Sequence, residues 1–350
     1  MDNLYKLTRL FGAALLIFSL GHATAFSQED DCAVKLKEAQ ACFDRGQVEL
    51  VSGLVNPCIQ SGSFTREDEL IAYKLLIQAL LLDENTSSAE TFMLEFLRKN
   101  PEYEHTAADF SGFVYVKNKF EVKPVIMLSA QVGLNYMFMT GHSERSVSSL
   151  PPDISISREP INLYAGAEVL YPLTPRLKVA GGLFFSTSSF ISTENLLSFA
   201  TVEYQENMSR FEIPLSAIYD FKRFGAVTLF GRLGGGYAIN LKTDSKALTT
   251  PNDVNNGFNR TGENVDRSNS RIGSDFFIQA GLGGLVKIPH GYFTAEVKTA
   301  LGIRNQVIGS HPGSLEYYYF YTDNSFKMNM IGFSFGYIHI FYKPSKSKDL

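Results

Sequence analysis

The chain has no tryptophan, only three cysteines and only six histidines among its 350 residues. The histidines are scattered and lack the spacing of metal ligands, so no metal site is expected. A glycine run at residues 231–236 lacks the Lys-Ser/Thr and the helix of a phosphate-binding loop. No nucleophile–base pair stands out either. We therefore expect no enzyme and no cofactor, and the net charge of −4 does not favour a nucleic-acid partner.

Long hydrophobic runs are also missing. Beyond the first residues, no apolar run approaches the roughly 18 residues that predict a transmembrane helix. The first residues have the pattern of an export signal: Lys6 and Arg9 precede an apolar stretch of 11 residues, Leu10–Leu20. This stretch is too short to span a bilayer. Cleavage after Ala25 or after Ser27 fits equally well, and we expect residues 1–27 to be a signal peptide.

A helical domain is predicted over residues 28–101. Its first hairpin pairs a helix over about 33–45 with one over about 48–56. In the second hairpin, Thr65 predicts the N-cap of one helix, and Ser87-Ser88-Ala89-Glu90 predicts a capping box at the start of the next.

All three cysteines fall in this helical domain, and an exported chain is free to form disulfides. Cys32 lies at the start of the first predicted helix, and Cys58 lies just past the end of the second. An antiparallel hairpin brings these two ends together. Cys42 is ten residues further along the first helix, about 15 Å away, whereas a disulfide needs Cα atoms within about 7 Å. We expect a Cys32–Cys58 disulfide; three unpaired core cysteines are the alternative.

Four helices in two antiparallel pairs resemble tetratricopeptide repeats. Tyr73, Leu76, Ala89 and Pro101 fall on the aromatic, Leu, Ala and Pro positions of that repeat. Such repeats usually need at least three units to bury a core, so a disulfide would compensate for the missing unit. The resemblance implies a concave surface for a peptide or protein partner. An aromatic-rich linker is expected to follow over residues 102–123.

Residues 124–343 alternate apolar with small or polar residues in about eight blocks, without a helix between them. In the first block Leu128, Val132 and Leu134 share one face, and Ser129 and Gln131 share the other. One side of such a strand meets lipid, and the other meets polar groups. The predicted strands cover 125–139, 161–172, 177–190, 202–221, 226–242, 273–288, 291–306 and 324–342. The predicted fold class is a mainly β membrane barrel of about eight antiparallel strands, with an N-terminal α-helical domain.

The connections between the predicted strands are alternately short and long. Outer-membrane barrels have short periplasmic turns and long outside loops. The longer connections, at 140–160, 191–201, 243–272 and 307–323, are therefore expected outside the cell. An even strand count returns the chain to the side where it entered, so we expect the helical domain in the periplasm. A tail is expected over residues 344–350.

The same alternation sends a set of charged side chains into the barrel lumen. They are Glu168, Lys178, Arg210, Glu212, Arg232, Glu296 and Lys298. An unpaired buried charge is costly, and hairpin register predicts that Glu212 pairs with Arg232 and that Glu168 pairs with Lys178. An eight-stranded barrel has room only for side chains, which favours a plugged interior. An ion or proton path through these charges is the alternative.

One block in the fourth predicted strand, Arg210-Phe211-Glu212-Ile213-Pro214-Leu215, precedes a glycine-rich strand. This arrangement resembles the PorT-like outer-membrane β-barrel proteins of Bacteroidetes. The front part is similar to an arrangement that often precedes such barrels, with Cys32 opening a helix, Cys58 closing the hairpin and Asn100–Tyr103 following. Some members of that family serve gliding motility or type IX secretion, although a shared fold does not transfer the role.

The last long connection carries an aromatic run, which is either an extension of the eighth strand or a surface patch for a ligand or partner. The candidate patch is Tyr317, Tyr318, Tyr319, Phe320 and Tyr321. Taken together, the sequence predicts a non-enzymatic outer-membrane barrel that anchors a periplasmic interaction domain. Its partner would be a component of an envelope complex for secretion, motility or assembly. The alternative is a transporter or surface-ligand binder that acts through the outside loops.

Overall fold

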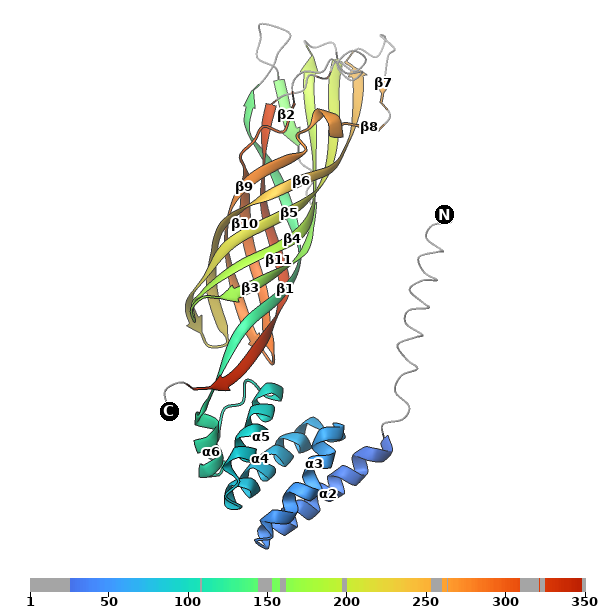
Figure 1. The fold of residues 1–350 in the computed structure, drawn as a ribbon. Helices are drawn as coiled ribbons and strands as arrows, with labels where there is room; N and C mark the ends of the chain where they lie inside the picture. Colours follow the sequence, from blue (N-terminus) through green and yellow to red (C-terminus); the bar gives the residue numbers. More distant parts are fainter. Residues whose placement is uncertain are drawn as a thin grey trace. The chain divides into compact units, whose positions relative to one another are not determined.

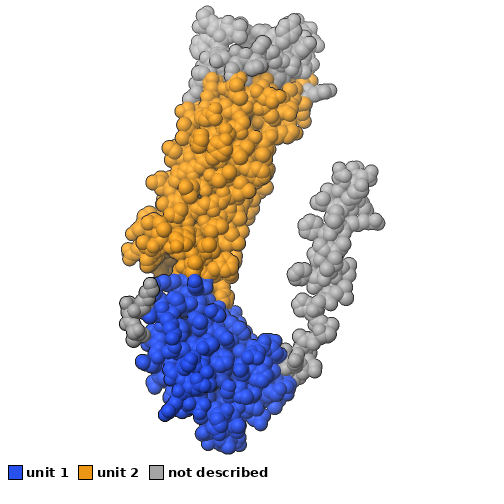
Figure 2. Space-filling view, viewed as in Figure 1, with its two compact units in different colours: residues 1–123, 342–350 blue, residues 124–341 orange. Residues whose placement is uncertain are grey.

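The computed structural model describes residues 26–107, 109–143, 153–157, 162–196, 200–252, 260–262, 264–308, 321 and 325–347. The chain divides into two compact units, shown in Figure 2: a helical unit of residues 1–123 with 342–350, and a barrel unit of residues 124–341. None of the described helices is long and apolar enough to cross a membrane.

The helical unit contains the helices α2 (Phe26–Asp44), α3 (Val48–Ser61), α4 (Arg66–Leu82), α5 (Thr86–Lys99) and α6 (Ser111–Asn118). Between α2 and α3, Gly46 takes the left-handed conformation that ends a helix, with φ +78°. The sequence predicted that α3 ends at about residue 56, before Pro57. That prediction is wrong. Buried Val55, Cys58 and Ile59 pack the last turns of α3 into the core.

Both α4 and α5 begin at a residue whose side chain caps the helix, but only the cap of α4 is the predicted one. The side chain of Thr65 accepts a hydrogen bond from the Asp68 backbone N–H at 3.1 Å, which confirms the predicted N-cap of α4. The capping box predicted over Ser87–Glu90 is wrong. Helix α5 starts earlier, and Asn85 caps it by accepting from the Ser88 N–H at 3.2 Å. Asparagine is as strong an N-cap as serine, and it comes first in the chain.

The predicted disulfide joins Cys32 of α2 to Cys58 of α3, with the Cα atoms 5.7 Å apart. Cys58 lies in the last turn of α3 rather than past its end, since the helix is longer than predicted. Cys42 is free and buried.

The predicted linker after α5 is an ordered part of the helical unit. It forms α6, which packs against α4 and α5. Phe113 of α6 meets Phe96 of α5 edge to face, with the ring centroids 5.6 Å apart. Asp109, just before α6, accepts hydrogen bonds from Lys74 Nζ at 2.7 Å and from the Tyr103 hydroxyl at 2.6 Å.

The C-terminal residues also belong to the helical unit. The last strand, predicted to end at residue 342 before a tail over 344–350, continues to Lys346. The extra residues have partners within this unit. The Tyr342 hydroxyl donates to Glu102 at 2.7 Å, and the Ser347 N–H donates to the Lys119 carbonyl at 2.8 Å.

The barrel unit is a closed ring of eight tilted strands (Figure 1): β1 (Phe120–Ser143), β3 (Asn162–Pro172), β4 (Leu177–Leu196), β5 (Ala200–Phe224), β6 (Val227–Pro251), β9 (Ser274–Ile288), β10 (Gly291–Gly302) and β11 (Ser325–Lys346). Around the ring the order is β1, β3, β4, β5, β6, β9, β10, β11, and β11 pairs with β1. Three short strands add to the ring: β2 (Asp153–Ser157), β7 (Arg260–Thr261) and β8 (Val265–Asp266). The predicted fold class is confirmed.

The lower part of the ring, nearer the chain's entry and exit, has an apolar outer face. On β5 the exposed side chains include Phe211, Ile213, Leu215 and Tyr219, and the buried inward ones include Glu212 and Ser216. From Phe211 to Phe221, about ten steps of about 3.3 Å at a tilt of about 40° give a height of about 25 Å. That is the height of the apolar band of a membrane barrel. We call this part the apolar belt.

Above the belt the polarity of the wall is reversed. On β5 the outward residues Glu203 and Asn207 are exposed, whereas the inward Val202, Tyr204 and Met208 are buried. The inward side chains form an apolar cluster that fills this part of the ring: Met137, Phe190, Val202, Tyr204, Met208, Ala247, Tyr321, Phe326 and Met328. A water-facing sheet over an apolar core has this pattern, so we call this part the upper barrel.

Two segments predicted as loops contribute strands to the upper barrel. The connections predicted at 191–201 and 243–272 are partly strand, because β4 runs to Leu196, β5 starts at Ala200 and β6 runs to Pro251. The wall of β6 here is lined inside by Thr243, Ser245, Ala247 and Thr249. These inward residues are small or polar like the outward ones, so the sequence here lacks the apolar alternation of a strand and resembled a loop.

Candidate functional site

The lumen within the apolar belt is filled by a network of charged side chains. Arg232 of β6 is at its centre. Its Nη1 and Nη2 donate to the two carboxylate oxygens of Glu168 on β3, each at 2.8 Å, and its Nε donates to Glu296 on β10 at 2.7 Å. All three side chains are buried. A two-pronged pairing of this kind is the strongest that an arginine makes with a carboxylate.

A second pair lies beside the first. The Nε of Arg210 donates to Glu212 Oε1 at 2.9 Å, and Ser186 of β4 donates to the same oxygen at 2.6 Å. Lys298 of β10 donates to the hydroxyl of Tyr164 on β3, and its ammonium lies 3.6 Å from the centroid of that ring. We call Glu168, Arg210, Glu212, Arg232, Glu296 and Lys298 the lumen network. It contains three acids and three bases and is therefore neutral.

The predicted pairings within this set are wrong. Glu212 pairs with Arg210 rather than Arg232, and Glu168 pairs with Arg232 rather than Lys178. Hairpin register considers only neighbouring strands, whereas Arg232 reaches across the lumen to strands elsewhere in the ring. Lys178 lies apart from the network and donates to Asp220 at 2.6 Å, a partner that the sequence did not suggest.

Little free space remains around the network. Two cavities border it, one beside Gln131 and Arg232 and the other beside Glu212 and Lys298, and each has a volume of about 10 Å³. A cavity needs about 10–15 Å³ to hold one water molecule. Over the described residues, this level of the lumen therefore has no room for a water-filled channel.

The upper barrel holds a further buried ion pair, which the sequence did not predict. Arg271 lies in the segment between β8 and β9, and its Nε donates to Glu206 of β5 at 2.8 Å. Both side chains are at most 1% exposed. The guanidinium also lies over the ring of Phe326, 5.6 Å from its centroid. We call Glu206, Arg271, Tyr204, Tyr321 and Phe326 the mouth cluster.

The mouth cluster contains one residue of the predicted aromatic patch, Tyr321. Tyr321 is 7% exposed and stacks on Tyr204, with the ring centroids 3.7 Å apart. It is therefore a core residue and not part of a surface patch. The other residues of the predicted patch, Tyr317, Tyr318, Tyr319 and Phe320, lie outside the described residues.

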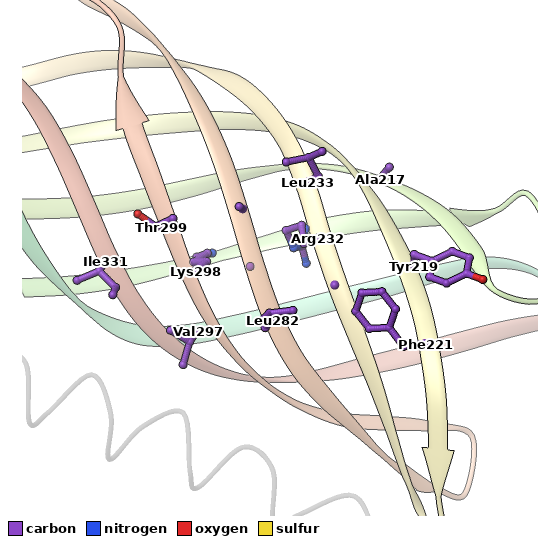
Figure 3. A pocket seen from close by; sticks show the side chains of 13 residues that line it. Ala217, Tyr219, Phe221, Arg232, Leu233, Leu282, Val297, Lys298, Thr299 and Ile331 are labelled. Carbon is purple, nitrogen blue, oxygen red and sulfur yellow. The ribbon is translucent and has the colours of Figure 1, made fainter.

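The outer wall of the belt is hollowed on one side, as Figure 3 shows. The hollow has a volume of about 590 Å³ and is lined by apolar side chains such as Tyr219, Leu233 and Leu282. Three small residues, Ala217, Gly231 and Ala280, are part of its lining, and a Cβ at Gly231 would lie 2.7 Å from the ring of Phe221. Its place in the belt and its apolar lining suit contact with lipid chains.

A closed, tilted ring with an apolar belt outside and ion pairs inside is the architecture of an outer-membrane barrel. The family signature of the outer membrane protein beta-barrel domain matches residues 126–306. The chain belongs to this family. It is accordingly an outer-membrane protein. A search of curated proteins gave no match.

Solved structures with a similar fold include three bacterial proteins of low sequence identity. Ail, the attachment invasion locus protein of Yersinia pestis, is 11% identical over 61% of this chain and 99% of its own, with a TM-score of 0.26. Neisserial surface protein A is 13% identical over 63% and 98%, with a TM-score of 0.29. OprG of Pseudomonas aeruginosa is 10% identical over 64% and 98%, with a TM-score of 0.27.

Proposed function

We propose that the barrel is a filled, non-conducting anchor and that the helical unit is a periplasmic interaction domain for a component of an envelope complex. The lumen network is the observation that supports a filled, non-conducting barrel. Arg232, Glu168 and Glu296 join three strands across the lumen, in the middle of the apolar belt. A transporter would need a path at this level, and the ion pairs occupy it.

The strand count and the turns support the proposed periplasmic placement of the helical unit. Because β1 and β11 are neighbours, the chain enters and leaves the ring at the same end. The tight connections 173–176, 225–226 and 289–290 lie at that end too. Short turns are typical of the periplasmic end of such barrels, and this supports a periplasmic helical unit.

An interaction role is supported by the arrangement of the helices. Helix α4 contacts both α2 and α6, so the first helix of each hairpin lies beside the next, as in tetratricopeptide repeats. These three helices carry the exposed apolar side chains Val34, Ile71 and Tyr115. Exposed apolar residues on adjacent elements are typical of a protein-binding face. The likeness to PorT-like barrels of Bacteroidetes, some of which serve secretion or motility, suggests the class of partner.

The test is copurification of the full-length protein from native membranes. Ile71→Glu on α4 is expected to abolish copurification of an envelope protein, because a charge would be buried in the interface. Leu50→Glu on α3 is the matched control, since Leu50 and Ile71 are each 48% exposed. Heat-modifiable gel mobility checks that the barrel is folded in each variant. Equal recovery of every associated protein with the two variants would contradict an interaction face on α2, α4 and α6.

A further inference from the structure

The hollow in the outer wall of the apolar belt follows from the register of three strands, β5, β6 and β9. Its lining residues there belong to two neighbouring rows that cross the strands. One row is Ala217, Leu233 and Ala280, and the next is Tyr219, Gly231 and Leu282. Small and large residues alternate along each row and are staggered between the rows. The small residues therefore form the floor of the hollow, and the large ones form its sides (Figure 3).

The hollow is suited to a hydrocarbon chain. Its volume of about 590 Å³ is within the range of small-ligand sites. Arg232 and Lys298 also border it, but their charged groups bond to Glu168 and Tyr164 inside the lumen. The wall that faces the bilayer is therefore apolar. An empty hollow loses dispersion contacts along its lining, and a chain that fills it restores them.

A cation lies at one end of the hollow. Phe221 lines the hollow, and Lys222 is the next residue of β5. Lys222 is directly opposite Leu229 of β6, and opposite residues share one face of a sheet. Leu229 is exposed on the outer face of the ring, so Lys222 lies on that face too. Its ammonium is 5.0 Å from the centroid of the Phe224 ring, and no carboxylate among the described residues pairs with it.

The end of the ring that carries Lys222 is basic. Arg176, Arg223 and Lys287 are exposed in or beside the three tight turns at this end. The acid nearest to Lys222 in the chain, Asp220, is already paired with Lys178. Exposed lysine and arginine side chains at a membrane surface attract anionic lipid headgroups. The apolar belt ends at Phe221, so Lys222 lies at the level where a headgroup would be.

We propose that the hollow binds one acyl chain of an anionic phospholipid, whose phosphate contacts Lys222. The apolar lining holds the chain, and the cation selects the headgroup. In the proposed orientation the tight turns are periplasmic, so the lipid comes from the periplasmic leaflet. This choice of leaflet rests on the proposed function, whereas the binding site itself does not.

The experiment uses the full-length protein in nanodiscs that contain equal amounts of phosphatidylglycerol and phosphatidylcholine. Native mass spectrometry counts the lipids that remain bound after release from the disc. We expect the unaltered protein to retain phosphatidylglycerol in at least fivefold excess. Ala217→Leu with Ala280→Leu fills the hollow and is expected to lower this retention at least fivefold. Both alanines are exposed on the outer face, so the larger side chains leave the packing of the lumen unchanged.

Each half of the site has a matched control. For the hollow it is Ala130→Leu with Ala167→Leu, because these two alanines are an exposed pair on β1 and β3, outside the hollow. For the headgroup, Lys222→Gln is expected to abolish the excess of phosphatidylglycerol over phosphatidylcholine. Lys246→Gln, an exposed change in the upper barrel, is expected to keep that excess.

Three results would overturn the proposal. The first is equal lipid retention by the hollow variant and its alanine control, and the second is an unaltered protein or a Lys222→Gln variant with the same preference as expected for the other. The third is a lipid-free dimer that only the hollow variant abolishes, which would assign the hollow to a second copy of the chain. Heat-modifiable mobility checks that each barrel is folded. Copurification of an envelope protein with the helical unit is measured separately, so the two proposals can fail independently.

Discussion

Arg232 and Glu168 face each other across the barrel lumen and make two parallel hydrogen bonds of 2.8 Å each. The residues are 64 positions apart in the chain. The pair is enclosed by the apolar belt, where neither charge has bulk water to compensate for a lost partner. Its value to the fold therefore depends on both partners being present.

Arg232→Met is expected to destabilise the barrel by about 3–5 kcal/mol, because it leaves Glu168 and Glu296 buried without their partner. Because the chain has no tryptophan, circular dichroism during urea unfolding in lipid vesicles measures the lost stability. A triple variant that also carries Glu168→Gln and Glu296→Gln is expected to recover most of the stability, since no charge is then left unpaired. A single variant as stable as the unaltered protein would contradict the role given to this arginine.

The mouth cluster makes a local prediction. Arg271→Ala removes the partner of Glu206 and the cation over Phe326, and it is expected to loosen the segment before β9. Amide hydrogen exchange of residues 264–273 should accelerate by tenfold or more, while the strands of the belt keep their protection. Lys246→Ala, an exposed change on the outer face of β6, is the control. Exchange that rises equally in the belt would mean that the cluster supports the whole ring.

The disulfide is expected to stabilise the helical unit. A link between residues 26 positions apart gives about 3.5 kcal/mol by the loop-entropy relation. Cys32→Ser with Cys58→Ser should therefore lower the midpoint of helix unfolding, measured as protease resistance of α2–α5 in increasing urea. Cys42→Ala is the matched control, because this thiol is free. If the variant without the disulfide resists protease as well as the Cys42→Ala control, the disulfide does not stabilise the helical unit.

Asp109 predicts a pH dependence of the helical unit. Burial alone would raise the pKa of Asp109, but hydrogen bonds from Lys74 and Tyr103 outweigh it and hold this pKa well below the ordinary value. A depressed pKa contributes stability that is complete above about pH 4, the unfolded value, and is lost as the pH falls below it. Asp109→Asn is expected to cost about 2 kcal/mol at pH 7 and less at pH 3.

Thermal unfolding of the helical signal at several pH values checks this expectation. Asp44→Asn is a suitable control, since Asp44 is an exposed carboxylate at the end of α2. If the Asp109→Asn variant differs from the unaltered protein by the same amount at pH 3 and pH 7, the carboxylate does not titrate as its contacts imply.

Much of the fold could be predicted because period-2 alternation is a local signal. Leu128, Val132 and Leu134 revealed the outer face of β1 without any knowledge of its neighbours. The partners of the charges could not be predicted in this way. Glu206 lies on β5 and Arg271 lies in the segment before β9, two strands away in the ring, so the register of adjacent strands does not reveal their contact. Pairing needs the tilt and the stagger of the closed barrel.

The reversal of polarity in the upper barrel was missed for a different reason. A strand with apolar residues inside and polar residues outside has the same period as a membrane strand, with the opposite burial. On β5 the alternation of Val202, Tyr204 and Met208 with polar neighbours carried the signal. On β6 the inward residues between Thr243 and Thr249 are small or polar, so no apolar stripe marked the strand.

The boundary between belt and upper barrel can be tested by placing one charge on either side of it. Leu215 is 64% exposed in the apolar belt, and Leu215→Lys is expected to lower folding stability in lipid vesicles by about 2–4 kcal/mol. Glu203→Lys lies on the same face of β5, about 40 Å further along the strand at about 3.3 Å per residue. It is expected to cost less than about 0.5 kcal/mol, because its side chain is in water. A similar cost at the two positions would mean that the bilayer covers both, and the upper barrel would then be part of the membrane-spanning region.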